Sequence, residues 1–292
     1  MLYRKTSTGE AGFQVFNYSF LAFIAFLMIY PFWELLIVSV SPAVEASKIG
    51  LKLIPRGFTL EAYRMVFESK LIVYGYFNSI FRTVVGTSIT VFLCFLTAYP
   101  LAKKMLPARN AFTVYYLIPM FFSGGLVPNF LLIKSLGLLD TIWALIIPTL
   151  LSTFQILIMR NFIMSLPESL EESALVDGAG FFTILLRIVI PLSMPIFATV
   201  ALWEAVAHWN SWFDAMIYTR SNRNVVLQLL LRRVLIEHNN EGITDSLQGD
   251  EGVVTKTVEA ATVLVTIGPV ILMYPFLQKY FIKGVLIGSL KG

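Results

Sequence analysis

The chain of 292 residues is 57% hydrophobic and only 14% charged, far from the averages of soluble domains. We therefore expect a membrane protein that crosses the bilayer several times, and we exclude an ordinary soluble domain. The formal net charge of +4 does not indicate nucleic-acid binding, because membrane proteins collect lysine and arginine at the membrane boundaries. The single cysteine, Cys94, excludes an intramolecular disulfide.

Uncharged intervals predict an all-α fold with six membrane-spanning helices. A span needs about 20 residues, each rising about 1.5 Å, to cross a hydrocarbon core of roughly 30 Å. In chain order, the intervals place the spans at about 13–40, 74–101, 111–132, 142–164, 184–215 and 258–282. No repeat or linker divides the sequence, so we expect residues 1–292 to form a single transmembrane domain.

The number of spans and the charged loops predict the orientation. Six spans bring both termini to the same side of the membrane. The short loop between the second and third spans carries Lys103, Lys104 and Arg109, and lysine and arginine in short loops favour the cytoplasmic side. Residues 165–183 then lie on that same side, whereas the polar loop 216–257 lies on the opposite side.

An acidic stretch between the fourth and fifth predicted spans stands out in a chain otherwise suited to lipid. Residues 167–180 contain four carboxylates, those of Glu168, Glu171, Glu172 and Asp177. Ser165 stands three residues before Glu168, the spacing of a capping box, and acidic side chains suit the positive end of a helix dipole. Gly178 and Gly180 break this helix. The pattern fits a surface helix that docks a soluble partner, and it fits an ordinary solvated loop equally well.

Some ionisable side chains fall inside the predicted spans, where they are costly and usually face the bundle interior or water. They are Glu34, Arg82, Glu204 and His208. Glu204 and His208 are four residues apart, so they share a helix face and can interact. These groups either belong to a solvated pathway or form pairs between helices, and pairing or a place at the headgroup boundary is the simpler interpretation.

A cluster of aromatic and polar residues lies near the end of the fifth predicted span. It consists of Trp203, Trp209, Asn210, Trp212 and Asp214. Tryptophan near a helix end is typical of an aromatic belt at the membrane surface, but aromatic faces beside amide and carboxylate groups also suit a sugar. Gln155, in the fourth span, has the same two interpretations. The candidate substrate-pathway residues are therefore Gln155, Glu204, Trp209, Asn210 and Trp212.

Common catalytic motifs are missing from the sequence. It contains no phosphate-binding Gly-x-x-x-x-Gly-Lys-Ser/Thr loop, no His-Glu-x-x-His and no Gly-x-Ser-x-Gly, the signatures of P-loop ATPases, metalloproteases and serine hydrolases. We therefore predict that the chain is not an enzyme, that it has no catalytic residue or metal site, and that it binds no cofactor. Energy for any transport must come from a partner or from an ion gradient.

Three short motifs follow one another at and after the acidic stretch: Glu172-Ser-Ala174, Asp177-Gly178-Ala179 and Ile188-Val-Ile-Pro191. Their spacing resembles the Glu-Ala-Ala loop of bacterial ABC-importer permeases. Further stretches, such as residues 123–129, Trp209-Asn210 and the ending 278–292, resemble the carbohydrate-uptake subgroup of these permeases. Within it they resemble the maltose-type second permease, in the branch that handles complex oligosaccharides through a lipoprotein receptor.

This resemblance implies that residues 168–180 form a coupling helix seated in a groove of a cytoplasmic ATPase subunit. The implied ATPase-coupling residues are Leu170, Glu171, Glu172, Ala174, Leu175, Asp177, Gly178, Ala179, Ile188 and Pro191. The resemblance also implies a C-terminal tail that contacts the ATPase subunits through Gly288, Lys291 and Gly292.

The same resemblance implies the partners of the chain. They are a second permease subunit, two ATPase subunits that bind ATP and Mg, an extracellular solute-binding lipoprotein and a carbohydrate substrate. The complex is expected in the lipid bilayer of the bacterial cytoplasmic membrane, with both termini of this chain in the cytoplasm and no nucleic acid bound. The alternatives are an ion-coupled secondary transporter with Glu34, Arg82 and Glu204 as relay groups, and a membrane scaffold without transport activity.

Overall fold

The structure, a computed structural model, describes residues 8–236 and 256–289, which are helices and loops without a strand. The all-α prediction is therefore confirmed for these residues. The chain divides into two compact units, Met1–Ser69 with Glu237–Ile267, and Lys70–Ile236 with Gly268–Gly292. That the whole chain forms a single transmembrane domain stays a prediction.

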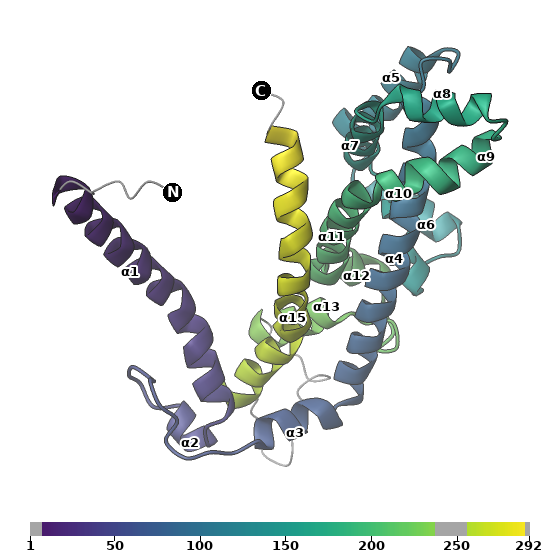
Figure 1. Ribbon diagram of the computed structural model, residues 1–292. Helices are drawn as coiled ribbons and strands as arrows, with labels where there is room; N and C mark the ends of the chain where they lie inside the picture. Colours follow the sequence, from purple (N-terminus) through teal and green to yellow (C-terminus); the bar gives the residue numbers. More distant parts are fainter. Residues whose placement is uncertain (1–7, 237–255, 290–292) are drawn as a thin grey trace. The chain divides into compact units, whose positions relative to one another are not determined.

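The first unit contains α1 (Thr8–Ser39), α2 (Ala43–Ala46), α3 (Glu61–Glu68) and the start of α15 (Lys256–Ser289) (Figure 1). Val38, Ala46 and Ala260 form its small buried core. Most described side chains of α1 are exposed and apolar on every side of the helix, as a helix in contact with lipid or another apolar partner requires. Glu34 lies half-buried in this helix.

The second unit is organised around α4 (Lys70–Ala102), along which α7 (Thr153–Met164) and α11 (Met194–Asn210) pack (Figure 1). Its core combines residues of all three helices, such as Phe95, Met159 and Val200. Besides the later part of α15, the remaining helices of this unit are, in chain order, α5 (Arg109–Phe121), α6 (Leu126–Ser135), η1 (Ile142–Leu145), η2 (Ile147–Thr149), α8 (Glu168–Val176), α9 (Phe181–Ile184), the π-helix η3 (Leu185–Val189), α10 (Ile190–Leu192), α12 (Phe213–Tyr218) and α13 (Leu227–Ile236).

Two of the predicted spans are continuous helices, because α1 over Gly12–Ser39 and α4 are each long and apolar enough to cross a membrane. The prediction of a continuous helix is wrong for 111–132, 142–164 and 184–215. In each of these ranges the chain bends between successive helical segments, by 110°, 48° and 71° respectively. Counting each bent pair as one span gives five spans among the described residues. The helix α15 covers the range of the sixth prediction, and the count of six stays a prediction.

Glycine and proline explain where the helices break. Gly125, just before α6, has a φ of +84°, a conformation that side chains with a Cβ rarely adopt. Ser193, the break between α10 and α11, stands between Pro191 and Pro195, and a proline cannot donate the backbone hydrogen bond that a continuing helix needs. Pro148 lies within η2, the short 3₁₀ helix that precedes the break before α7.

Candidate functional site

The acidic stretch forms α8, which lies at the end of the second unit where α4 finishes (Figure 1). The residue that precedes the helix is Pro167, which has no side-chain capping bond. The predicted capping box is wrong, because the Ser165 hydroxyl instead donates to the carbonyl oxygen of Phe162 at 2.7 Å. Ser165 therefore ends α7, and α8 begins after Pro167, whose missing N–H costs nothing at a helix start.

Gly178 ends α8 in a Schellman motif. Its φ is +81°, its N–H donates to Leu175 O at 3.0 Å, and the N–H of Ala179 donates to Ala174 O at 2.9 Å. This is the pair of bonds that satisfies the last carbonyls of a helix when a glycine follows it in the left-handed conformation. The predicted bend at Gly178 is therefore present, and it sets the direction in which the chain leaves α8.

One face of α8 lies against its own chain. Ala174 and Ala179 pack on the core of the second unit. The Glu171 carboxylate pairs with Lys103, in the loop that follows α4, and the Glu171 side chain is only 20% exposed. Glu171 and Ala174, expected to contact a partner, thus contact the same chain in this structure.

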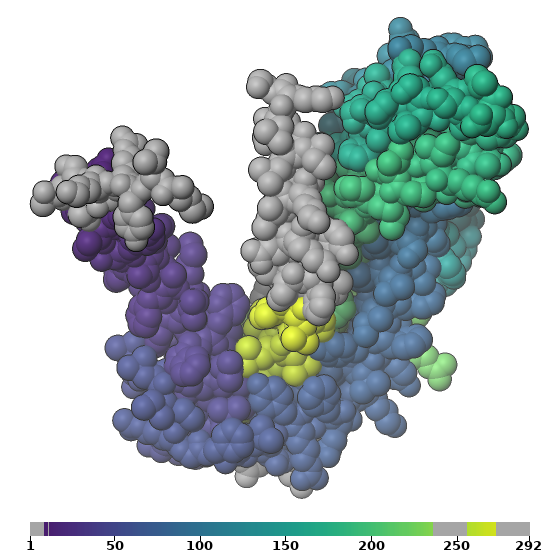
Figure 2. All heavy atoms as spheres, viewed as in Figure 1, coloured from purple at the N-terminus to yellow at the C-terminus, as the bar shows by residue number. Residues whose placement is uncertain are grey.

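The remaining surface of α8, its open face, carries exposed side chains. Leu170, Leu175 and Val176 are 42%, 46% and 88% exposed, and the neighbouring carboxylates of Glu172 and Asp177 are exposed as well. In Figure 2 the segment that contains α8 forms part of the visible outer surface of the second unit. Exposed apolar side chains flanked by carboxylates are a surface that another protein can cover.

The last two residues of the motif lie beyond α8. Ile188, in η3, packs on the same core as Ala174. Pro191 lies exposed within α10. The longer helix α11 starts only after the break at Ser193.

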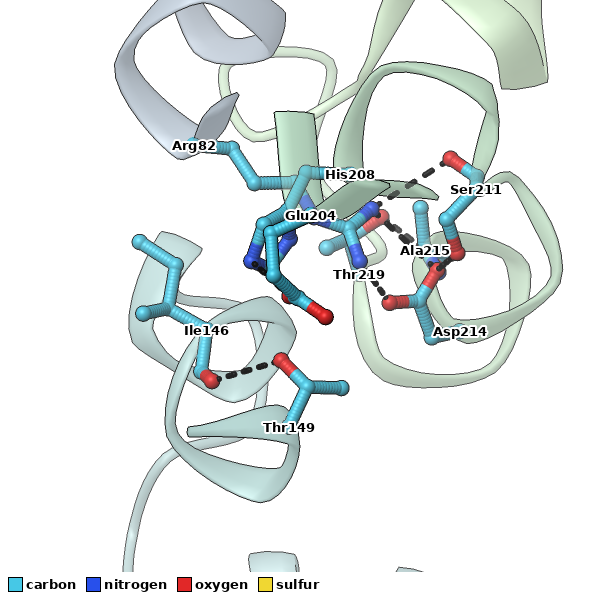
Figure 3. A network of polar contacts seen from close by, with 9 residues as sticks. All are labelled: Arg82, Ile146, Thr149, Glu204, His208, Ser211, Asp214, Ala215 and Thr219. Carbon is cyan, nitrogen blue, oxygen red and sulfur yellow. Dashed lines mark hydrogen bonds and ion pairs between the residues drawn. The ribbon is translucent and has the colours of Figure 1, made fainter. Parts of the chain in front are cut away.

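A second candidate site is a buried polar network between α4, α11 and α12 (Figure 3). Arg82 of α4 is 1% exposed and pairs with Asp214 of α12 through both guanidinium NH groups. The same guanidinium donates to the carbonyl oxygen of Ser211 at 3.3 Å. The Ser211 hydroxyl lies 2.8 Å from Asp214 Oδ1. A buried charge therefore meets an opposite charge, as buried ions require.

Glu204 and His208 continue this network along α11. The Gln155 side chain of α7 donates to Glu204 Oε1, and His208 Nε2 lies 3.6 Å from Glu204 Oε2. Gln155, Glu204 and His208 are 5%, 9% and 3% exposed. The thiol of Cys94 lies 3.9 Å from the Gln155 side-chain oxygen. The contact of Gln155 with Glu204 joins α7 to α11, as the simpler interpretation from the sequence expects, whereas Glu204 and His208 both lie on α11.

The predicted aromatic cluster is divided in the structure. Trp209 is 6% exposed and meets the Tyr76 ring edge-on at 6.3 Å between centroids. Asn210 is exposed and lies 3.4 Å from the Gln228 side chain, while the Trp212 ring lies 3.6 Å from the Arg232 guanidinium carbon, a cation–π distance. Trp209 packs inside the unit, so it does not form a continuous aromatic surface with Trp212.

The predicted tail lies largely outside the described residues. Lys291 and Gly292 are not described, and Gly288 is described only as part of the backbone of α15. Residues 237 to 255 of the polar loop 216–257 are also outside them. The roles expected for these positions stay predictions.

Ion pairs between α8 and the end of α4 were missed by the sequence reasoning. Lys104 Nζ lies 2.7 Å from Glu168 Oε1, and the hydrogen bond from this ammonium holds the pKa of Glu168 below its ordinary value. The signal was present, because two lysines and four carboxylates were predicted on the same side of the membrane. The sequence does not indicate which lysine pairs with which carboxylate, since Lys103 and Glu171 are 68 residues apart.

Asp140 was also missed. It has a φ of +58° and accepts hydrogen bonds at 2.9 Å from the backbone N–H groups of Arg220 and Ser221. Burial raises the pKa of Asp140, but these bonds and one from Asn224 outweigh it, so the pKa lies below its ordinary value. Asp140 thereby ties the loop after α6 to the loop after α12, opposite the α8 end of the unit in Figure 1.

No protein-family model matches the chain. The polygalacturonan/rhamnogalacturonan transport system permease protein YtcP of Bacillus subtilis (strain 168) is 38% identical over 287 residues, which cover 96% of this chain and 98% of YtcP. Protein LplC of the same organism is 39% identical over 285 residues, or 96% and 95% of the two chains.

Among solved structures, a chain of a bacterial ABC transporter involved in the import of the acidic polysaccharide alginate superposes with a TM-score of 0.88. It is 32% identical in sequence, and the match covers 95% of this chain and 99% of that chain. Similarity of this extent covers both candidate sites. The chain therefore belongs to the family of permease subunits of ABC transport systems, which are membrane proteins.

Proposed function

We propose that this chain imports an oligosaccharide as one of two permease subunits, using ATP hydrolysed by separate ATPase subunits, and that α8 is its coupling helix. In this proposal the chain itself is not an enzyme. ATP and Mg bind to the ATPase subunits, and the chain crosses the bacterial cytoplasmic membrane six times with both termini in the cytoplasm. An extracellular solute-binding lipoprotein delivers the substrate.

The open face of α8 carries the proposal. A short helix with Leu170, Leu175 and Val176 exposed, and with its other face packed on its own chain, is the kind of element that a hydrophobic groove recognises. Glu172 and Asp177 supply exposed carboxylates at the rim of this surface. Gly178, through its left-handed conformation, allows the helix to end abruptly.

An oligosaccharide is the substrate class that the relatives support. YtcP is named for polygalacturonan and rhamnogalacturonan, and the structural relative belongs to an importer of alginate. In this chain Asn210 and Trp212 are the pathway candidates nearest the surface. Gln155, Glu204 and Trp209 are buried, so we propose that they reach the substrate only if the helices around them move apart.

A co-purification experiment tests the coupling role. The chain is expressed with its partner subunits and purified through a tag, and the ATPase that accompanies it is quantified by mass spectrometry. Val176→Asp places a charge at the most exposed apolar side chain of α8, so we expect ATPase binding to weaken about thirtyfold, as for a hot-spot residue. Val44→Asp is the matched control, since Val44 is also an exposed valine, at 73%, on α2. Undiminished ATPase binding by Val176→Asp would falsify the coupling role of this face.

Uptake measurements test the substrate class. Cells with and without the chain are given labelled oligogalacturonides or arabino-oligosaccharides, and accumulation is followed while ATP is depleted. We expect one of these saccharides to accumulate only with the chain and only with ATP. Uptake that continues without ATP but stops with Glu204→Gln would favour an ion-coupled mechanism instead.

A further inference from the structure

Two ion pairs join α8 to the end of α4. Lys103 Nζ contacts both carboxylate oxygens of Glu171, and Lys104 Nζ lies 2.7 Å from Glu168 Oε1. Glu168 and Glu171 are three residues apart, so they share one face of α8. Lys103 and Lys104 directly follow Ala102, the last residue of α4.

The pair of Lys103 and Glu171 is partly shielded from water. The two side chains are 33% and 20% exposed, and the Lys103 ammonium also lies 4.6 Å from the centre of the Tyr99 ring, one turn back in α4. Ala174, one turn further along α8, continues the same face onto the core. The inward face of α8 is therefore occupied by its own chain, whereas the open face is not.

The covalent connection from α8 to α11 is poorly suited to passing on a movement. On the far side of Gly178, the chain goes through a π-helix, η3, and then a 71° bend at Ser193 before α11 begins. A bend and a π-helix are places where helices commonly yield. The ion pairs bypass both, because they join α8 directly to α4, along which α7 and α11 pack.

We propose that Lys103 and Lys104 are positioning residues that hold α8 on α4, so that a displacement imposed on α8 moves α4 with it. Glu168 and Glu171 are their counterparts, and thus serve the chain's own architecture while the open face of α8 serves the partner. This inference rests on the proposed coupling role of α8. It adds a second route, independent of the backbone, by which a displacement of α8 reaches α4.

Distance measurements in the full complex test this tether. Spin labels are attached to cysteines introduced at Ser169, exposed on α8, and at Ile80, 49% exposed on α4. With a rise of about 1.5 Å per residue, Ile80 lies about 33 Å from the end of α4. This distance suits double electron–electron resonance. The complex is measured free of nucleotide and trapped with ATP and vanadate. In the wild-type chain we expect one narrow distance peak in both states.

The variants are designed to separate charge pairing from folding. We expect Lys103→Glu to lose the single narrow peak in the trapped state while the complex still hydrolyses ATP, and the charge exchange Lys103→Glu/Glu171→Lys to restore the peak. Arg64→Glu is the matched control, because Arg64 also forms an ion pair, with Glu68, but on α3. It is expected to leave the peak unchanged.

The possible results are decisive for the tether. A narrow peak in Lys103→Glu, or a charge exchange that does not restore the peak, overturns it. If the Lys103→Glu complex no longer hydrolyses ATP, recovery of hydrolysis in the charge exchange supports the tether. If hydrolysis does not recover, Lys103 itself contacts the ATPase, and the tether is overturned. A wild-type chain that binds no ATPase overturns the proposed function of α8, and this result is obtained before any variant is made.

Discussion

The His208 imidazole lies directly against Gly86, with Nε2 only 2.5 Å from where a Cβ on residue 86 would stand. Gly86 is buried in α4 and His208 in α11, so the closest approach of these two helices depends on the absence of a side chain. His208 is 3% exposed, so its ring cannot simply swing out into solvent. The contact therefore fixes the separation of the two helices.

Gly86→Ala is expected to destabilise the chain by about 1–3 kcal/mol, the cost of overpacking a filled core. The measurement is thermal unfolding of the purified protein in detergent. Gly86→Ala/His208→Ala removes the ring that the new methyl group meets, so the two changes together are expected to cost less than the sum of the two single changes. Simple addition of the two effects would contradict a direct clash.

Asp214→Ala removes the counter-charge of Arg82, which is 1% exposed. Breaking a buried pair by removing one partner costs about 3–5 kcal/mol, and we expect a loss of this size in the same unfolding measurement. Asp214→Asn keeps an oxygen that can accept from Arg82, so its loss is expected to be smaller. Glu68→Ala, which breaks the exposed pair on α3, serves as the control and is expected to leave the unfolding temperature unchanged.

Gly178→Val tests the turn that ends α8. A residue with a Cβ pays about 1–2 kcal/mol in the left-handed conformation, and no atom lies within 4 Å of the Cβ position, so strain in the backbone is the only obstacle. We expect Gly178→Val to reach the membrane but to lose most of its uptake. Gly178→Asn is expected to retain more uptake, since asparagine enters this conformation more readily. Equal uptake by the two variants would exclude backbone strain as the cause.

The lowered pKa of Asp140 predicts that the stability of the chain decreases at acidic pH. Its pKa is lower in the folded chain than its ordinary value, so its contribution is complete above the unfolded pKa of about 3.9 and is lost as the pH falls through the folded value. Unfolding curves at pH 6, 4 and 3 measure this loss. Asp140→Asn cannot titrate, so the variant is expected to start less stable and to lose less on acidification. Parallel losses in both proteins would assign the acid sensitivity to other groups.

Local signals in the sequence predicted local structure well. The break at Gly178 follows from a glycine after a short acidic segment, although these signals left a helix and a solvated loop equally open before it, and the uncharged intervals located α1 and α4 within a few residues. Composition alone could not reveal that three other spans are bent. An uncharged interval measures length, whereas the bends depend on Gly125, Pro148 and Ser193 with its flanking prolines.

Pairing between distant residues could not be predicted. Arg82 was recognised as an ionisable group inside a span, and Asp214 as part of an aromatic cluster, but the two are 132 residues apart. Glu171 was assigned to a partner for the same reason, since nothing in its neighbourhood indicates that Lys103 reaches it. Side chains with more than one possible counter-charge need a three-dimensional arrangement before a role can be chosen.

Cys94 is the single cysteine of the chain and is 0% exposed. Its sulfur lies 3.8 Å from the carbonyl oxygen of Leu150, at the break before α7. Thiol reagents need a solvent-accessible thiolate, so the native chain offers them no ready target. Any cysteine introduced on the surface of α8, or on the loop held by Asp140, can therefore be labelled by itself without first removing a residue from the core.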